Sequence, residues 1–344
     1  MTTVQSIEKL DELLPDGYRA RPTILDDVPQ VVALLNLRSQ EVMGVDEHDE
    51  DDLRNDWTEP SWSLEENSRV VFAPDDTLVG FVEFYATAPY VRMSTWGAVH
   101  PEHRGRGIGS YSMEWSHAKA FETMKQAEPH LRIIFESWNY AEHKPTSDLL
   151  KDNGFQLARS FYDMLIEMEA EPPKPSWPEG ISIRSAVREQ DEWDVLVALD
   201  EAFEDHWGHV KSDLKERYER IMHHLRNDKD YDPSMWVLAI DDATGEIAGV
   251  ARNWPKTNED PDKAWVATLG VRRAYRKKGL GLALLLESFN VCYQRGIMKV
   301  GLGVDAENPT GALRLYEKAG MHVDQEFHAF RKELRPGEDI MNQG

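Results

Sequence analysis

A six-residue pattern, Arg-x-x-Gly-x-Gly, occurs twice and is the feature that most constrains the fold. The first copy runs from Arg104 to Gly109 and the second from Arg276 to Gly281, half a chain later. Each copy lies between an apolar strand-like segment and an apolar helix-like segment. Self-similarity over half of the chain indicates a duplicated unit. Because 344 residues suffice for two domains that each bury a core, the repeat predicts two domains of one fold.

The segments around the two loops recur in the same order. Each half opens with a strand and a helix, at residues 17–37 and 180–199, and continues with paired strands about an acidic turn. Strands are expected before the loops at residues 96–99 and 265–271, and after the loop helices at residues 131–138 and 299–304. Each half is therefore expected to form an α/β domain.

A proline-rich stretch separates the two halves. Prolines cannot donate to a strand ladder and favour a stiff, extended spacer. We therefore expect an N-terminal domain at residues 1–168, a linker at 169–180 and a C-terminal domain at 181–344.

Each glycine loop is a candidate site for a pyrophosphate. Glycines let the backbone approach a ligand closely, and the free amides at a helix start carry a partial positive charge. A single such loop is more often a tight turn, but two copies that each follow an apolar strand favour the phosphate site. The spacing suits neither a dinucleotide-binding loop nor a Walker loop. The expected contacts are Arg104, Gly105, Arg106, Gly107, Ile108 and Gly109, and in the second half Arg276, Lys277, Lys278, Gly279, Leu280 and Gly281.

Composition excludes several classes of partner. With 39 basic and 62 acidic residues the formal charge is -23, which would repel a nucleic acid. Cys292 is the only cysteine, so no intrachain disulfide forms, and a cytoplasmic location is expected. The most apolar run, Leu280–Leu286, is too short to span a membrane. Paired histidines such as His206 and His209 lack a second ligand pair, so no metal is expected.

Both loops resemble the signature of the GNAT superfamily of acetyltransferases, Gln/Arg-x-x-Gly-x-Gly/Ala between the fourth strand and the following helix. Residues 305–321 resemble a later segment of that family, where an asparagine contacts the CoA arm and a tyrosine lies near the thioester sulfur. These positions correspond to Asn308 and Tyr316. The resemblance covers nearly the whole chain twice, and the tandem arrangement is similar to that of mycothiol synthase and its relatives.

The resemblance implies the fold and the ligand. Each domain is expected to be a mostly antiparallel, splayed mixed sheet flanked by helices, in the α/β (α+β) class. Acetyl-CoA is the implied co-substrate. Its thioester carbonyl would be held by a backbone amide near the end of the fourth strand, at Leu269, Gly270 or Val271, with Val99 at the matching place in the first half.

The candidate acid and base for acetyl transfer differ between the two halves. The resemblance implies that Tyr316 protonates the leaving thiolate, although a tyrosine on an amphipathic helix is by default a core residue. Leu150 lies at the matching place in the first half, which is therefore expected to be catalytically degenerate. No carboxylate lies in residues 265–269, so the base is sought in Glu201, Asp205 and His206, which are equally well interpreted as solvated groups at a helix end.

These observations predict an acetyl-CoA-dependent N-acetyltransferase that acts on a primary amine of a small molecule by direct attack in the C-terminal domain. The alternative is a non-catalytic acyl-CoA-binding or regulatory module. The acceptor stays open among an aminoglycoside, a mycothiol precursor, a polyamine and a peptide end, and so does the oligomeric state.

Overall fold

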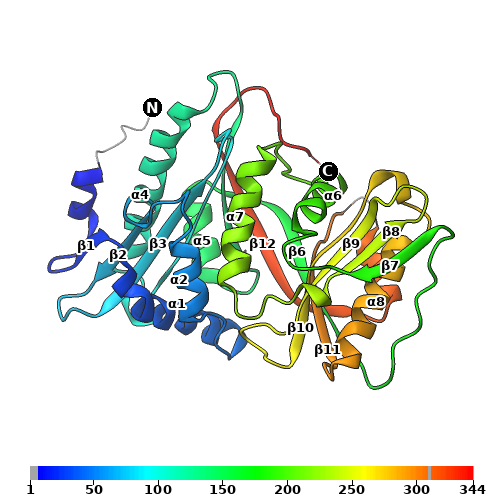
Figure 1. The fold of residues 1–344 in the computed structure, drawn as a ribbon. Coiled ribbons are helices and arrows are strands. Elements are labelled where there is room, and N and C mark those ends of the chain that lie inside the picture. Colours follow the sequence, from blue (N-terminus) through cyan, green and yellow to red (C-terminus); the bar gives the residue numbers. More distant parts are fainter. Residues whose placement is uncertain (1–6, 309–310, 344) are drawn as a thin grey trace. The chain divides into compact units, whose positions relative to one another are not determined.

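The computed structural model describes residues 7–308 and 311–343, which form two compact units (Figure 1). The N-terminal unit contains residues 1–159 and 327–340, and the C-terminal unit contains residues 160–326 and 341–344. Each unit is an open sheet with helices on both faces, as the sequence predicts.

The sheet of the N-terminal unit has the strand order β1-β2-β3-β4-β5-β12. All neighbours are antiparallel except the pair β4 and β5. The strands are β1 (Arg19–Pro22), β2 (Ser68–Phe72), β3 (Leu78–Ala86), β4 (Arg92–Val99), β5 (Ile133–Tyr140) and β12 (His322–Arg335). The helices are η1 (Ile7–Leu13), η2 (Leu25–Asp27), α1 (Val28–Met43), α2 (Glu50–Trp57), α3 (Leu64–Asn67), η3 (Pro101–His103), α4 (Ile108–Thr123), η4 (Met124–Gln126) and α5 (Lys144–Asp152).

The C-terminal unit repeats this arrangement, with the strand order β7-β8-β9-β10-β11-β6. Only β10 and β11 are parallel. The strands are β6 (Gln156–Glu167), β7 (Ile181–Ser185), β8 (Val237–Asp241), β9 (Ile247–Trp254), β10 (Lys263–Val271) and β11 (Lys299–Asp305). The helices are α6 (Glu192–Phe203), α7 (Leu214–Asn227), η5 (Pro233–Met235), η6 (Arg273–Tyr275), α8 (Leu280–Gln294) and α9 (Ala312–Lys318).

The last strand of each sheet comes from the other half of the sequence. In β6, residues 161–167 pair with β11, and in β12, residues 327–335 pair with β5. The division therefore differs from the expected one, which assigned residues 156–167 to the first domain and 327–335 to the second. The alternation of a strand fixes which of its faces is buried but not which sheet edge it joins, so sequence alone does not show this exchange. Residues 168–180, which contain the expected linker, form neither helix nor strand.

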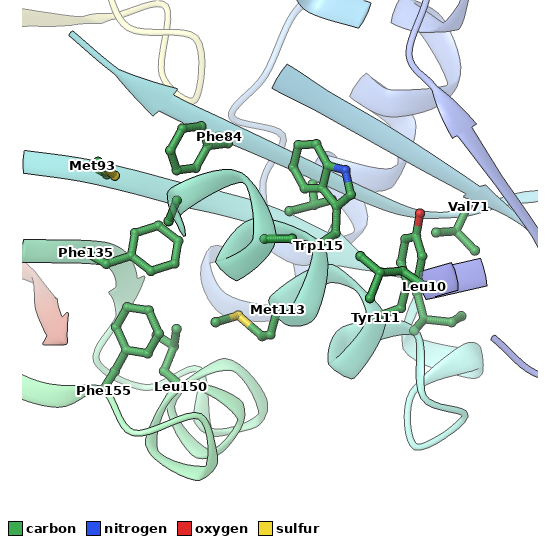
Figure 2. Packing of buried hydrophobic residues seen from close by; sticks show 14 of the residues in the cluster. Leu10, Val71, Phe84, Met93, Tyr111, Met113, Trp115, Phe135, Leu150 and Phe155 are labelled. Atoms are coloured by element: carbon green, nitrogen blue, oxygen red, sulfur yellow. The ribbon is translucent and has the colours of Figure 1, made fainter. Parts of the chain in front are cut away.

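Alternating side chains on the strands build two cores in the N-terminal unit. Val70 and Phe72 of β2 pack in one cluster with Val31 of α1, so α1 and α2 cover that face. Val71 points to the opposite cluster, which contains Tyr111 and Trp115 of α4 (Figure 2). Period-two alternation on β2 thus places the glycine-loop helix on one face and the first helix on the other.

The C-terminal unit is layered in the same way. Leu238 of β8 packs with α6 and α7, whereas its neighbours Val237 and Ala239 pack with Leu284 of α8. A Cβ on Gly249 of β9 would lie 2.9 Å from Leu284 Cδ1 and 3.1 Å from the Gly270 carbonyl oxygen, so a side chain here would force its neighbours to shift, and glycine favours the close approach of α8 to the sheet.

Candidate functional site

In each unit, the two central parallel strands separate after three residues of pairing. Strand β4 pairs with β5 only from Arg92 to Ser94, and β10 pairs with β11 only from Lys263 to Trp265. Beyond these points, within the described residues, the edges of β4 and β10 that face the neighbouring strand are unpaired, whereas their other edges continue to pair with β3 and, apart from a bulge between Val266 and Thr268, with β9. Alternate backbone N–H groups on these edges are available to a ligand.

The glycine loops lie at the open ends of these strands and begin the two long helices. Gly107 is the residue before α4, with φ 88°, and Gly279 is the residue before α8, with φ 87°. A side chain would strain this left-handed backbone at either position. The amides of the first helical turn have no partner within the helix, so each loop presents donors suited to a phosphate.

In the N-terminal unit the loop and the separated strands enclose a cavity of about 340 Å³. Of the residues predicted to bind ligand there, Val99, Arg104, Gly105, Gly107 and Gly109 line it. The Ile108 side chain is buried in the core, which leaves its backbone amide as its only possible contact. The Arg106 guanidinium donates a hydrogen bond to Tyr18 Oη at 3.3 Å and does not line the cavity.

In the C-terminal unit the predicted residues are spread over the strand end and the loop. Leu269, Gly270 and Val271 form the end of β10 and pair with β9 on one side. Lys278 and Leu280 line a separate pocket beside Tyr275, and Lys278 Nζ lies 5.6 Å from the centre of the Tyr275 ring. Lys277 has φ 62° and is exposed. A Cβ on Gly281 would meet Leu315 only at an ordinary contact distance of 3.5 Å.

The arginine that begins each loop is held by a carboxylate from the end of the first helix. Arg104 makes a bidentate ion pair with Glu41, at 2.8 and 2.6 Å. Arg276 donates to Asp205 Oδ2 at 2.8 Å and to the Ala202 carbonyl at 2.8 Å. Both units therefore have an ion pair that ties the first arginine of the glycine loop to the end of the first helix, and we infer that this ion pair positions the loop.

Two of the three residues proposed as the base form ion pairs in the structure. Asp205 bonds both Arg276 and Arg273, whose hydrogen bonds lower its pKa. Glu201 accepts from Arg272 Nε at 2.7 Å. These pairs favour a positioning role for both carboxylates, and their catalytic role stays a prediction.

His206 is placed differently from these two carboxylates. Its ring centre lies 4.4 Å from that of Phe203. Burial, and secondarily the Arg276 charge, lowers its pKa below the usual 6.5, whereas Asp305 and Asp205 oppose this shift. His206 is therefore mostly neutral near pH 7 and able to accept a proton.

Tyr316 lies on α9 and is 8% exposed, within the core cluster that also contains Leu302 and Leu285. Burial raises the pKa of its phenol to about 12, so the hydroxyl keeps its proton at neutral pH. The packing of Tyr316 agrees with a core residue, and its protonated hydroxyl is compatible with a general acid that protonates the leaving thiolate. Asn308 follows β11 in a turn in which its N–H bonds the Asp305 carbonyl at 3.1 Å. Pro309 and Thr310 of the same segment lie outside the described residues.

The N-terminal unit contains a carboxylate that the sequence analysis missed. Glu83 of β3 accepts hydrogen bonds from Trp57 Nε1 and Trp96 Nε1, each at 3.2 Å, and Trp96 lines the cavity. Burial raises the pKa of Glu83 to about 7, which the two indole hydrogen bonds oppose. The signal was present, because Glu83 is the one charged residue in an otherwise apolar strand, Leu78–Ala86.

Within residues 7–308 and 311–343, no group of three or more His, Cys, Asp or Glu side chains is arranged to hold a metal ion. None of the helices in the same described ranges combines the length and apolar character needed to cross a membrane. Cys292 is fully buried, and burial raises its thiol pKa to about 12, so the thiol stays protonated at neutral pH.

Comparison with known families decides the classification of the fold and its two loops. The model of the acetyltransferase (GNAT) family matches residues 31–143 and again residues 194–321. The chain belongs to the GNAT acetyltransferase family. It is an N-acetyltransferase of the tandem type, and each family match contains one complete glycine loop.

Individual relatives extend over most of the chain. The mycothiol acetyltransferase of Salinispora arenicola is 30% identical over 89% of this chain and 94% of its own length. A crystal structure of a GCN5-related N-acetyltransferase from Sphaerobacter thermophilus has 33% identity and a TM-score of 0.77, covering 95% of this chain and 98% of that one. A tandem GNAT protein from the clavulanic acid biosynthesis pathway has 17% identity and a TM-score of 0.69, covering 93% of this chain and all 100% of that one, and supports the fold alone.

Proposed function

We propose that this GNAT-family chain transfers the acetyl group of acetyl-CoA to a primary amine of a small molecule, and that the C-terminal unit carries out the transfer. One observation carries the proposal: the glycine loop at the start of α8 lies beside the end of β10, where a Cβ on Gly281 would be 3.8 Å from Val271 Cγ2 and where, among the described residues, the edge of β10 toward β11 has no strand partner. A phosphate donor site and a carbonyl donor site thus lie within one unit, as a thioester of a nucleotide requires. The N-terminal unit shares this arrangement, but it has Leu150 at the position of Tyr316.

The residues of the C-terminal unit fit acetyl-CoA. The amides after Gly279 would hold the pyrophosphate, and an N–H among Leu269, Gly270 and Val271 would hold the thioester carbonyl. Asn308, in the turn after β11, would contact the pantetheine arm. Acetyl-CoA supplies an activated acyl group and a thiolate leaving group.

Two side chains would act as general base and general acid during the transfer. His206, mostly neutral near pH 7, would accept the proton that the amine nitrogen loses as the C–N bond forms. Tyr316 Oη would donate a proton to the departing sulfur as the C–S bond breaks. Its phenol stays protonated at neutral pH because burial raises its pKa to about 12.

A second candidate places the transfer in the N-terminal unit, and Glu83 is the specific observation that favours it. With a pKa of about 7, Glu83 is partly ionised at neutral pH and lies beside Trp96, which lines the 340 Å³ cavity. Leu150, which also lines the cavity, stands where a tyrosine would be needed and cannot donate a proton. This unit therefore offers a base without the acid, and we propose binding or support as its main role.

An acceptor screen tests the function. The full chain is incubated with acetyl-CoA and single amines drawn from aminoglycosides, polyamines, amino acids and peptides, and released thiol is measured. Acetylation of one class above the rate of spontaneous hydrolysis supports an enzyme. Tight acetyl-CoA binding without transfer to any class would favour the non-catalytic binding module instead.

A further inference from the structure

A second cavity lies in the C-terminal unit, away from the glycine loop. It occupies about 310 Å³ between α6, α7 and the strands β9 and β10. That volume lies at the lower end of the range of small-molecule sites. Its walls are mainly apolar, formed by Val195, Leu196, Leu199, Phe203, Ile221, Leu225 and Trp236. The polar lining residues are Arg252 of β9, together with Glu192, Arg217 and Thr268.

Arg252 has few partners for a guanidinium so enclosed. Its Nη2 donates to Thr268 Oγ1 at 2.9 Å, and its Cζ lies 5.4 Å and 5.7 Å from the ring centres of Trp236 and Trp254. Its Nε is buried and has no hydrogen-bond partner. Burial lowers the pKa of Arg252 to about 10, so the group still carries its charge at neutral pH. A buried cation without a counter-ion is costly unless a ligand supplies one.

The carboxylates around the cavity have partners other than Arg252. Glu192 Oε1 accepts from Tyr231 Oη and from the Glu189 N–H, both at 2.7 Å. Asp200 pairs with Arg217 at 2.7 Å. Within the described residues, no carboxylate therefore pairs with Arg252. Glu192 Oε2 is buried without a partner and offers an acceptor to a donor group of a ligand.

We propose that this cavity binds the carboxylate of a small apolar molecule, with the carboxylate on Arg252. Charge-assisted hydrogen bonds from a guanidinium to a carboxylate are short and strong, and the apolar walls accommodate a hydrocarbon body. The unpaired Nε supplies a donor that no other group among the described residues uses.

The position of the cavity connects this ligand to the transfer reaction. Phe203 lines the cavity, and its ring centre lies 4.4 Å from that of His206. A molecule anchored at Arg252 and extending past Phe203 would bring an amine toward His206. Resting on the proposed function, we therefore infer that the acceptor is an apolar amine that also carries a carboxylate, such as an amino acid or a short peptide.

The matching position of the N-terminal unit carries the opposite charge. Arg252 lies three residues after Gly249, and Glu83 lies three residues after Gly80; both glycines face the glycine-loop helix of their unit. The carboxylate preference is therefore specific to the C-terminal unit.

Calorimetric titration of the full chain without acetyl-CoA tests the binding. The probes are 3-phenylpropionate and its amide, 3-phenylpropionamide, which share a shape and differ in charge. Wild type is expected to bind the acid at least about tenfold more tightly than the amide, equivalent to about 1.4 kcal/mol. Equal affinities, or no binding of either probe at millimolar concentration, would overturn the proposal.

Substitutions test whether Arg252 causes the tighter binding of the acid than of the amide. Arg252→Met should abolish the preference while retaining the melting temperature, and Arg252→Lys should retain part of it because the charge remains. Arg226→Gln, on the exposed surface of α7, is the matched control and should bind like wild type. An acid preference that survives in Arg252→Met would overturn the assignment.

Measurements of turnover distinguish a failure of the carboxylate site from a failure of the proposed acetyl transfer. L-phenylalanine and 2-phenylethylamine differ by the carboxylate, and the first should be acetylated with the higher kcat/KM in wild type but not in Arg252→Met. Equal kcat/KM values in wild type would overturn the acceptor class. If no amine releases thiol although 3-phenylpropionate still binds through Arg252, the proposed function fails and the carboxylate site stands.

Discussion

Arg331, close to the C-terminal end of the chain, forms an ion pair with Glu136 in the sheet of the N-terminal unit. Glu136 is also bonded by Arg92 Nε at 2.6 Å, and its side chain is only 1% exposed. The pair joins β12 to β5, so a late segment of the sequence completes the sheet of the first unit.

Glu136→Ala is expected to lower the free energy of unfolding by about 3 kcal/mol, because it leaves the largely buried Arg331 without its carboxylate. Urea denaturation followed by circular dichroism measures the loss. Glu333→Ala, which removes the exposed partner of Arg132 on the same strand, is the control and should cost less than about 1 kcal/mol. Equal effects of the two changes would mean that the buried pair does not hold β12 in place.

The sequence predicted the repeated elements because each is determined locally. The apolar strands expected at residues 96–99 and 265–271 lie within β4 and β10, and the pattern of glycines placed the starts of α4 and α8. The exchange of β6 and β12 was missed, because the choice of sheet edge depends on contacts between distant segments.

The candidate site was only partly predictable for a similar reason. Loop residues such as Gly107 belong to a contiguous motif, whereas Glu83 receives its indole partners from α2 and β4, which only the fold brings together. Asp205 was predicted near the site, but the sequence did not show that Arg276 would engage it. Motifs can thus be found in sequence, whereas the protonation and pairing of their neighbours require the fold.

Gly279→Val should sharply weaken acetyl-CoA binding and turnover, because a β-branched residue cannot readily adopt φ 87° and would disturb the first-turn amides. The matched change Gly107→Val, at φ 88°, should weaken a site in the N-terminal unit and leave most turnover. Calorimetric titration of acetyl-CoA and thiol release give the two readouts. The reverse partition, with turnover lost in Gly107→Val and kept in Gly279→Val, would move the reaction to the N-terminal unit.

The pH dependence of kcat/KM distinguishes the two proposed bases. A base acts when deprotonated, so the rate rises with pH through its pKa. For His206, whose pKa is lowered by burial, the rise should lie below pH 6.5, and for Glu83 it should lie at about pH 7. His206→Gln should remove the acid-side break, and Glu83→Gln should leave it unchanged. Titration of the amine itself adds a separate rise that neither variant alters.

We propose that the C-terminal unit transfers the acetyl group and that Tyr316 donates the proton to the leaving sulfur. Tyr316→Phe isolates the hydroxyl because the ring and its core packing remain. The variant should melt near wild type and bind acetyl-CoA equally, while its kcat falls by at least about tenfold, within the range of general-acid catalysis. Wild-type turnover by Tyr316→Phe, under conditions where chemistry limits the rate, would contradict this role and leave Tyr316 a core residue.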